Sequence, residues 1–410
     1  MQLTISKKLL IGASLGTMLE YYDFALFALF LPIISPVFFP SHSAYGSLET
    51  GYYALMITLI ARPLGGLIFG YIGDTYGRRG ALLGSMYGIA IATFIIGITP
   101  SYSTIGIAAI VIVIMAKAAQ VFCYGGEYNG AGIYVVENAK PGQEAFVGSI
   151  LTAIAVSGSL IASLLGIIST WPGMPDWSWR VLFMLGGLVG LFGIFYRKNL
   201  TESPNFKVGK KKNATLKELF KHYPKELVLG AFIGGFTVLP YTTVVIFINP
   251  VLTTKHDLTN VQLMMLQGLL MLISMVVLVV CGRLADKFTP GKVMKWAALA
   301  LTIGAYPLIL LVDAKGLATT IVAEIILIII NQSLLAPSNA YFKNLFAMEY
   351  RYRASSVSFC FGMSLIGGIT PVIENYLYKT THHFSSISIW LIVISAITFI
   401  LLRQRQQAQI

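Results

Sequence analysis

Long apolar runs separated by short polar segments make up almost the whole chain. A helix needs roughly 20 apolar residues to cross a bilayer, and runs of about that length recur along the sequence. The pattern predicts twelve spanning helices at approximately 9–38, 49–72, 81–99, 103–137, 144–170, 178–199, 226–252, 260–284, 291–312, 316–338, 354–379 and 386–403. The fold class expected is therefore an all-α polytopic membrane protein.

Composition agrees with this pattern. Hydrophobic residues make up 56% of the 410 residues and charged residues 11%, whereas soluble proteins carry about 25% charged residues. A soluble globular protein is excluded, because it would have no use for this much apolar surface. The net charge of +12 would suit a nucleic-acid partner, but the positions of the charges argue against one.

The positive charges lie mainly on one side of the predicted membrane. If both termini are cytoplasmic, 23 of the 29 Lys and Arg residues lie in the cytoplasm, four lie outside, and Arg62 and Lys117 lie within spans. This asymmetry follows the positive-inside rule and predicts an even number of helices with both termini in the cytoplasm. The three cysteines and five histidines show no disulfide or metal-ligand spacing, so we expect no metal and no cofactor.

The longest polar segment, 200–225, separates six predicted helices from six more. We therefore predict an N-terminal six-helix bundle at 1–199, a cytoplasmic central loop at 200–225 and a C-terminal six-helix bundle at 226–410. The halves echo each other at their second helices, because Asp74 follows Gly70 by four residues and Asp286 follows Gly282 by four. A repeat of this kind places the substrate site of a transporter between the halves near the midplane.

One motif and several longer segments resemble a known family. The pattern Gly70-x3-Asp74-x2-Gly77-Arg78-Arg79, which we expect to form a tight cytoplasmic loop over 73–79, resembles the loop signature of the major facilitator superfamily. The segments Leu19–Phe24, Ala61–Gly66 and Gly125–Ala131 resemble the metabolite:proton symporter family, with the proline/betaine transporters as the nearest general likeness. Thr152 departs from the family pattern, which often has Asp there.

The resemblance implies a secondary active transporter with the major facilitator fold in a bacterial inner membrane. Such proteins carry a small organic solute with a proton, need no cofactor and are functional monomers. Their partners are the solute, protons and the lipid bilayer. No Ser/His/Asp set, HExxH motif or phosphate loop occurs in the sequence, so we do not expect an enzyme.

Charged residues inside the bilayer are the first candidates for a transport role, because each costs about 2.5–3.5 kcal/mol on insertion scales. Glu20, Asp23 and Lys117 all fall near the midplane of a hydrocarbon core about 30 Å thick. Glu20 and Asp23 are three residues apart and share a helix face. They could bind a proton or substrate together with Lys117, or they could form a static ion pair that holds the first and fourth helices together.

The fourth predicted helix carries a polar stripe. Lys117, Gln120, Tyr124 and Glu127 recur at three- and four-residue steps and so share one face. Such a face in an apolar helix meets either a water-filled path or other helices. We expect Glu127 near the cytoplasmic mouth, either in a gate ion pair or as a packing residue.

A second group is assigned to gating and conformational change. Arg62 could bind a substrate carboxylate, but we favour pairing with a gate acid. Asp74 is expected to accept hydrogen bonds from a helix N-terminus and to pair with a basic residue of the other half. Arg78, Arg79 and Asp286 join it in this group.

In the second half, Asn331 and Gln332 lie at mid-depth of the tenth predicted helix. They could hydrogen-bond a zwitterion or bond to neighbouring helices. Glu374 is expected near the outer edge, in water. The function predicted is import of a proline/betaine-type zwitterion or an organic acid with a proton by alternating access. A uniporter or exchanger with the same fold is the alternative, and a membrane sensor is the weaker rival.

Overall fold

The computed structural model describes residues 7–41, 46–47, 50–51, 54, 60–197, 216–249, 252, 258–313 and 316–407. No residue in these ranges lies in a β-strand. The first half of the chain contains α1 (Lys7–Phe38), α3 (Ala61–Thr75), α4 (Arg78–Ile98), α5 (Tyr102–Ile105), α6 (Ile107–Glu137), α7 (Glu144–Ser169) and α8 (Ser178–Arg197). The second half contains α9 (Leu216–His222), α10 (Pro224–Thr242), η1 (Thr243–Ile248), α12 (Asn260–Phe288), α13 (Pro290–Asp313), α14 (Leu317–Leu335), α15 (Ser338–Leu345), α16 (Arg351–Gly362), η2 (Met363–Gly367), α17 (Thr370–Thr381), η3 (Phe384–Ile387) and α18 (Ser388–Gln407).

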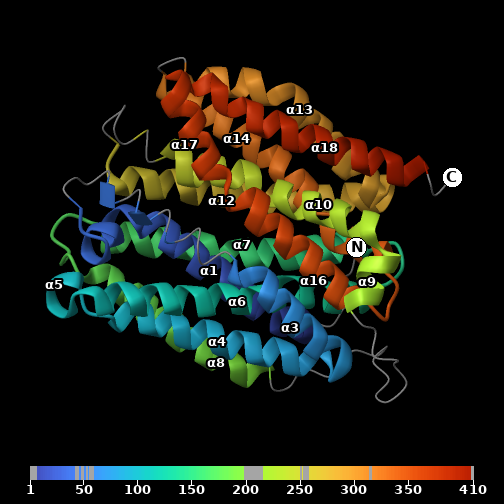
Figure 1. Cartoon of the computed structure of the whole chain (residues 1–410), viewed down its shortest axis with the longest axis horizontal. Coiled ribbons are helices and arrows are strands. Elements are labelled where there is room, and N and C mark those ends of the chain that lie inside the picture. Colours follow the sequence, from blue (N-terminus) through green and yellow to red (C-terminus); the bar gives the residue numbers. More distant parts are fainter. Residues whose placement is uncertain are drawn as a thin grey trace.

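The long helices run side by side in two groups (Figure 1). In the view of Figure 1, the helices of the first half, in blue to green, form the lower group, and most of those of the second half, in yellow to red, form the upper group. The start of α1 and the end of α18 lie at the same end of the bundle as α9 (Figure 1). This arrangement is the one that an even number of membrane crossings requires.

Helix lengths confirm eleven of the twelve predicted membrane spans. Eleven helical stretches of the described residues are long and apolar enough to cross a bilayer. The remaining predicted span, 49–72, corresponds to α3, whose 15 residues follow a stretch that lies partly outside the described residues. Of the predicted central loop 200–225, residues 200–215 also lie outside the described part, and α9 occupies much of the remainder.

The loop expected over 73–79 is wrong in extent. Helix α3 continues to Thr75 and α4 begins at Arg78, so only Tyr76 and Gly77 separate the two helices. Gly77 has φ 111°, a value that residues with a Cβ atom rarely adopt, and this lets the chain reverse within two residues. Asp74 and both arginines of the motif therefore lie on helices, with orientations that the helices fix.

Three helices of the second half are interrupted where single spans were expected. The seventh span changes from α10 to the π-helical η1 at Thr243, and the eleventh passes from α16 through the π-helical η2 to α17. The tenth consists of α14 and α15, with a break at Ala336 and Pro337. Short π-helical segments are frequent at functional sites. These interruptions bring irregular backbone close to the middle of the molecule.

Close glycine contacts repeat between the halves. A Cβ atom at Gly158 of α7 would lie 2.0 Å from the carbonyl oxygen of Met18 in α1. In the second half, a Cβ atom at Gly362 of α16 would lie 1.7 Å from the carbonyl oxygen of Ala231 in α10. Both positions require glycine, since nothing larger lets the helices cross this closely. The same crossing at equivalent helices supports the interpretation of the chain as a six-helix repeat.

Candidate functional site

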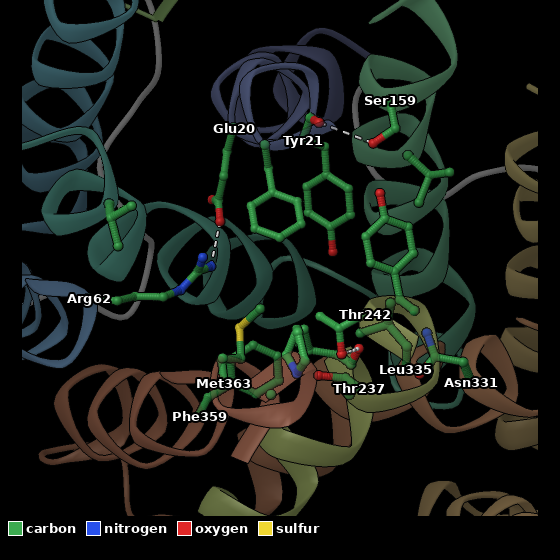
Figure 2. Close-up of a pocket in the computed structure, with 18 of the residues that line it drawn as sticks. Glu20, Tyr21, Arg62, Ser159, Thr237, Thr242, Asn331, Leu335, Phe359 and Met363 are labelled. Carbon is green, nitrogen blue, oxygen red and sulfur yellow. Dashed lines mark hydrogen bonds and ion pairs between the residues drawn. The ribbon is translucent and has the colours of Figure 1, made fainter. Parts of the chain in front are cut away.

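A cavity of about 130 Å³ lies between the two halves (Figure 2). Its walls come from α1, α3, α6 and α7 of the first half and from α10, α12, α14, α16, η2 and α17 of the second. The volume is small beside the roughly 300–1,000 Å³ of sites for drug-sized ligands, and it suits a small solute. The cavity lies between the halves, where the six-helix repeat predicted a substrate site.

Glu20 and Arg62 form a buried ion pair in one wall of this cavity. Arg62 Nη2 donates to Glu20 Oε1 at 2.5 Å, and the two residues are 4% and 2% exposed (Figure 2). The guanidinium carbon lies 5.6 Å from the ring centroid of Tyr124. Glu20 Oε2 and Arg62 Nε have no hydrogen-bond partner among the described residues. Each member of the pair therefore retains one unused polar atom beside the cavity.

Lys117 is the second cation of the cavity wall. Its Nζ donates to Gln120 Oε1 at 2.6 Å and lies 4.5 Å from the ring centroid of Phe27. Gln120 Nε2 donates to Thr93 Oγ1 at 2.7 Å, and Thr93 Oγ1 lies 2.6 Å from Asp23 Oδ2. Lys117 and Asp23 are thus joined through two neutral side chains.

The structure corrects the expectation that Glu20 and Asp23 work as a pair. The side chain of Glu20 turns to Arg62 of α3, whereas Asp23 turns to Thr93 of α4. Positions three apart on a helix differ by about 60° in direction, and here that difference sends them to different neighbours. Of the two, only Glu20 lines the cavity. Gln120 and Tyr124, also expected at the site, lie behind the wall, in contact with the side chains that line it.

The opposite wall is neutral and hydrogen-bonding. Asn331 and Gln332 line it. Gln332 Nε2 donates to Ser274 Oγ of α12 at 3.2 Å, which is the bond to a neighbouring helix that was the alternative to a substrate role. Asn331 Oδ1 and Gln332 Oε1 accept no hydrogen bond from the described residues. Thr237 and Thr242 add hydroxyl groups nearby (Figure 2). The second half thus offers amide and hydroxyl groups facing the charged wall of the first half.

Aromatic side chains complete the walls, and sequence reasoning assigned most of them no role. Tyr21, Phe24 and Tyr241 line the cavity, and the rings of Phe24 and Tyr241 are 6.1 Å apart, from opposite halves. Tyr21 is also held in place through its backbone, because Ser159 Oγ donates to its carbonyl oxygen at 3.1 Å (Figure 2). The signal for Tyr21 was its place beside Glu20, but an aromatic residue in an apolar helix rarely stands out.

At one end of the bundle, two aspartates join the halves through backbone groups. Asp74 Oδ2 accepts a hydrogen bond of 3.1 Å from the backbone N–H of Arg353, in the first turn of α16. Asp286 Oδ1 and Oδ2 accept from the N–H groups of Ala145 and Phe146, in the first turn of α7, at 2.9 Å each. Carboxylates at helix N-termini are favoured by the free N–H groups and the helix dipole. The hydrogen bond expected of Asp74 is confirmed, and Asp286 repeats it.

An ion-pair network at the same end centres on Glu137, which sequence reasoning did not select. Its carboxylate accepts from Arg78 of α4 and, at 2.9 Å, from Arg351 of α16. The side chain of Glu137 is only 1% exposed. Lys343 of α15 adds a weaker contact to Glu144, at 3.3 Å. Glu137 ends a long helix, where an acidic residue is usually solvent-exposed, so no pattern in the sequence indicated its role.

The other gating candidates lie in different surroundings. Glu127 is fully buried and accepts a hydrogen bond of 2.6 Å from Ser85 of α4, ten residues before the network at the end of α6. Arg79 is exposed, unlike its neighbour Arg78. Arg62, for which a gate acid was favoured, has Glu20 as its partner in the middle of the bundle. A gating role for these residues remains a prediction.

Two acids of the second half are buried. The expectation that Glu374 lies in water is wrong: it is 0% exposed, and its Oε1 lies 2.6 Å from Thr243 Oγ1. Glu324 is also 0% exposed, and neither of its oxygens has a hydrogen-bond partner among the described residues. Depth estimated along a helix does not reveal which side a residue faces, so burial of these two could not be predicted.

Comparison with known proteins agrees with this architecture. The model of the Major Facilitator Superfamily matches residues 13–371, which is most of the chain. This chain belongs to the major facilitator superfamily. Its membership establishes a polytopic membrane transporter for small molecules, with twelve helices in two six-helix bundles, and not an enzyme.

Relatives in this superfamily agree with the sequence resemblance. The chain is 30% identical over 410 residues to a putative proline/betaine transporter of Staphylococcus haemolyticus, covering 97% of this chain and 87% of the relative. It is 26% identical to the proline/betaine transporter of Escherichia coli K12, covering 96% and 82%. Among solved structures, the proton:xylose symporter XylE superposes with a TM-score of 0.76 at 15% identity, covering 97% and 95%. This likeness shows the shared fold.

Proposed function

We propose that this superfamily member imports a small zwitterion or organic acid together with a proton by alternating access. The names of the relatives, proline/betaine transporters, support a zwitterionic substrate. The observation that carries the proposal is the Glu20–Arg62 ion pair in the cavity wall. It places a carboxyl that can hold a proton beside a guanidinium that can hold a carboxylate.

The pair supports coupling by competition. A substrate carboxylate that enters the cavity can bind the guanidinium of Arg62, which presents several N–H groups in a planar fork. Glu20 then loses its counter-ion, and a carboxylate left unpaired in a buried site is costly unless it takes up a proton. Substrate and proton therefore bind together. When both leave on the other side, the Glu20–Arg62 pair forms again.

The two walls of the cavity suit the two ends of a zwitterion. Arg62 and Lys117 offer positive charge to a carboxylate. The faces of Tyr21 and Tyr241 and the side-chain oxygen of Asn331 suit an ammonium group, by cation–π contact or hydrogen bonding. An organic acid would use the positive wall alone. The aromatic and amide groups of the opposite side favour a zwitterion.

The contacts at one end of the bundle support alternating access. Asp74, Asp286 and Glu137 join the halves there, on the side where the positive-inside rule places the cytoplasm. We infer that this structure has its cytoplasmic side closed. Opening toward the cytoplasm would break these contacts and expose the cavity on that side. The same charge rule supports cytoplasmic termini, and the bacterial relatives support an inner-membrane location.

Uptake into proteoliposomes tests the proposal. The purified chain, reconstituted with a proton gradient, should concentrate one or more of proline, betaine, dicarboxylates and shikimate, and should acidify the lumen as it does so. If the gradient concentrates none of them but labelled substrate still exchanges, the protein is a uniporter or exchanger. If a substrate binds but neither accumulates nor exchanges, the sensor alternative is favoured.

A further inference from the structure

Glu374 is a buried carboxyl group beside the cavity to which the coupling argument gives no role. It lies on α17, two residues after Val372, which lines the cavity. Its Oε1 lies 2.6 Å from Oγ1 of Thr243, the first residue of η1, and its Oε2 has no hydrogen-bond partner among the described residues. The contact thus joins the outer segments of two interrupted helices.

The geometry around Thr243 fits a protonated acid. Thr243 Oγ1 also lies 2.9 Å from the carbonyl oxygen of Leu239, one turn earlier. A hydroxyl group has one hydrogen and can donate to only one of these two oxygens. If Thr243 donates to Leu239, a protonated Glu374 can donate to Thr243, and both contacts are filled. An ionised Glu374 would leave one contact unfilled and a negative charge buried beside an empty Oε2.

The first half contains the same arrangement. Thr93 Oγ1 lies 2.6 Å from Asp23 Oδ2 and 2.8 Å from the carbonyl oxygen of Ile89, also four residues earlier. Asp23 Oδ1, like Glu374 Oε2, has no hydrogen-bond partner in the described part of the chain. The two sites differ in one respect. Thr93 also connects through Gln120 to a lysine, whereas the only hydrogen bond of Glu374 among the described residues is the one with Thr243.

In the part of the chain that the structure describes, few groups around Glu374 could titrate in its place. The elements packed against α17 are η1, η3, α10 and α18. The first two contain no titratable residue, and α18 has its charged residues at its far end. The titratable groups nearest in sequence or packing are Tyr241 at the end of α10, Tyr376, Tyr378 and Lys379 on α17 itself, and the exposed His382 and His383 that follow it.

We propose that Glu374 is a second proton-binding residue of the carrier and that its proton holds α17 against η1 on the outer side of the cavity. The proposal rests on the proton symport put forward above. Glu374 takes its proton from water at the outer mouth and donates it in a hydrogen bond to Thr243, which draws the two outer segments together. Loss of that proton to water leaves a charge that must be hydrated, and the segments separate.

Infrared spectroscopy of the purified full chain tests the protonation directly. At neutral pH, the wild type should show the C=O stretching band of a buried neutral carboxylic acid, and Glu374→Gln should remove one component of it. Thr243→Val, which keeps the shape but removes the hydroxyl, should shift that component. Glu349→Gln makes the same chemical change at an exposed acid and should leave the band unaltered. An unaltered band in Glu374→Gln would overturn the proposal.

Transport measurements separate this proposal from the proton symport on which it rests. In proteoliposomes, Glu374→Gln should keep substrate exchange and proton-driven accumulation through Glu20 but change the outer-pH profile of the initial uptake rate, since Gln mimics a permanently protonated Glu. If the wild type accumulates substrate with a proton gradient and Glu374→Gln keeps its pH profile, the role of Glu374 is wrong and symport stands. If the wild type ignores the gradient, symport is wrong, and the infrared band still decides whether Glu374 holds a proton.

Discussion

Arg62 Nη2 lies 2.5 Å from Glu20 Oε1, and this ion pair joins α3 to α1 within the first half of the molecule. The charges at the centre of the bundle therefore do not hold the two halves together. They pair within one half, in the wall of the cavity. Closure between the halves depends on other contacts, made near the end of the bundle.

The first prediction concerns Glu20. Glu20→Gln should abolish proton-driven accumulation but preserve exchange of labelled for unlabelled substrate, because Gln imitates the protonated acid and can still release Arg62 to the substrate. Accumulation and counterflow in the same proteoliposomes measure the two activities. Glu349→Gln is the control, since Glu349 is exposed and remote from the proposed site. Accumulation that persists in Glu20→Gln would show that another group couples the proton.

The second prediction concerns the glycine of the α3–α16 contact. A Cβ atom at Gly73 would lie 2.1 Å from Cε1 of Tyr352 in the other half. Gly73→Ala should therefore destabilise the conformation that is closed at this end. A Ser338→Cys reporter, introduced into a variant without the native cysteines, measures this effect. Position 338 is buried in the closed structure, so its labelling by maleimide should increase.

Gly80 provides the matched control for Gly73. A Cβ atom at Gly80 meets nothing within 4 Å, and Gly80 lies in the first turn of α4. Gly80→Ala should leave labelling unaltered and raise stability by about 0.5–1 kcal/mol, the usual gain from replacing glycine in a helix. Equal labelling in the two alanine variants would contradict the steric argument.

The third prediction concerns Glu137, whose carboxylate joins Arg78 and Arg351 across the halves. Glu137→Gln should weaken closure at this end by about 1–3 kcal/mol, because two guanidinium groups lose their charged acceptor. Glu144→Gln is the matched comparison. Its bond to Lys343 is longer, at 3.3 Å, and both side chains are more than one-fifth exposed, so its effect should stay below about 1 kcal/mol.

Reporter labelling measures this difference as well. A double-mutant cycle between Glu137→Gln and Arg351→Gln should show a coupling energy, since the two side chains are in direct contact. Additive effects of the two substitutions would mean that the pair makes no contribution to closure.

The fourth prediction concerns Glu324, which is fully buried with both oxygens unpartnered among the described residues. Glu324→Met, of similar size and apolar, should raise the stability of the purified protein by on the order of 1–3 kcal/mol, the usual cost of an unsatisfied buried polar group. Thermal unfolding measures the change. Leu327→Met, one turn further along α14, should change stability by less than about 1.5 kcal/mol. A loss of uptake in Glu324→Met would instead give this acid a transport role.

The parts of the fold that could be predicted from sequence depend on the local pattern of apolar, polar and charged residues. The spans follow from the lengths of apolar runs, so the predicted span 144–170 differs from α7 by one residue. Asp74 and Asp286 could be placed because their motif puts a carboxylate at a helix end, where free N–H groups of another helix are available. Lys117 and Asn331 could be placed from depth and polarity alone.

The predictions that were wrong depend on the direction in which a side chain points and on which helix packs against it. The side chains of Glu20 and Asp23 diverge because the neighbouring helices differ on either side of α1, which spacing along one helix does not show. Glu137 and Glu374 were missed or misplaced because charge and depth do not specify which helix packs opposite. Pro240 precedes η1 by three residues and Pro371 follows η2, but a proline near a helix break does not specify a π-helical segment, so both spans were predicted as uninterrupted.

The hydrogen bonds that Asp74 and Asp286 accept from the opposite half depend on one side chain each. Their partners are backbone N–H groups in the first turns of α16 and α7, and almost any residue at those positions would supply the same donor. Proline is the exception, because it has no backbone N–H to donate, although a helix accepts proline in its first turn. Sequence variation at Ala145 or Arg353 should therefore leave these hydrogen bonds nearly unchanged, whereas replacing either aspartate by an apolar residue removes the acceptor.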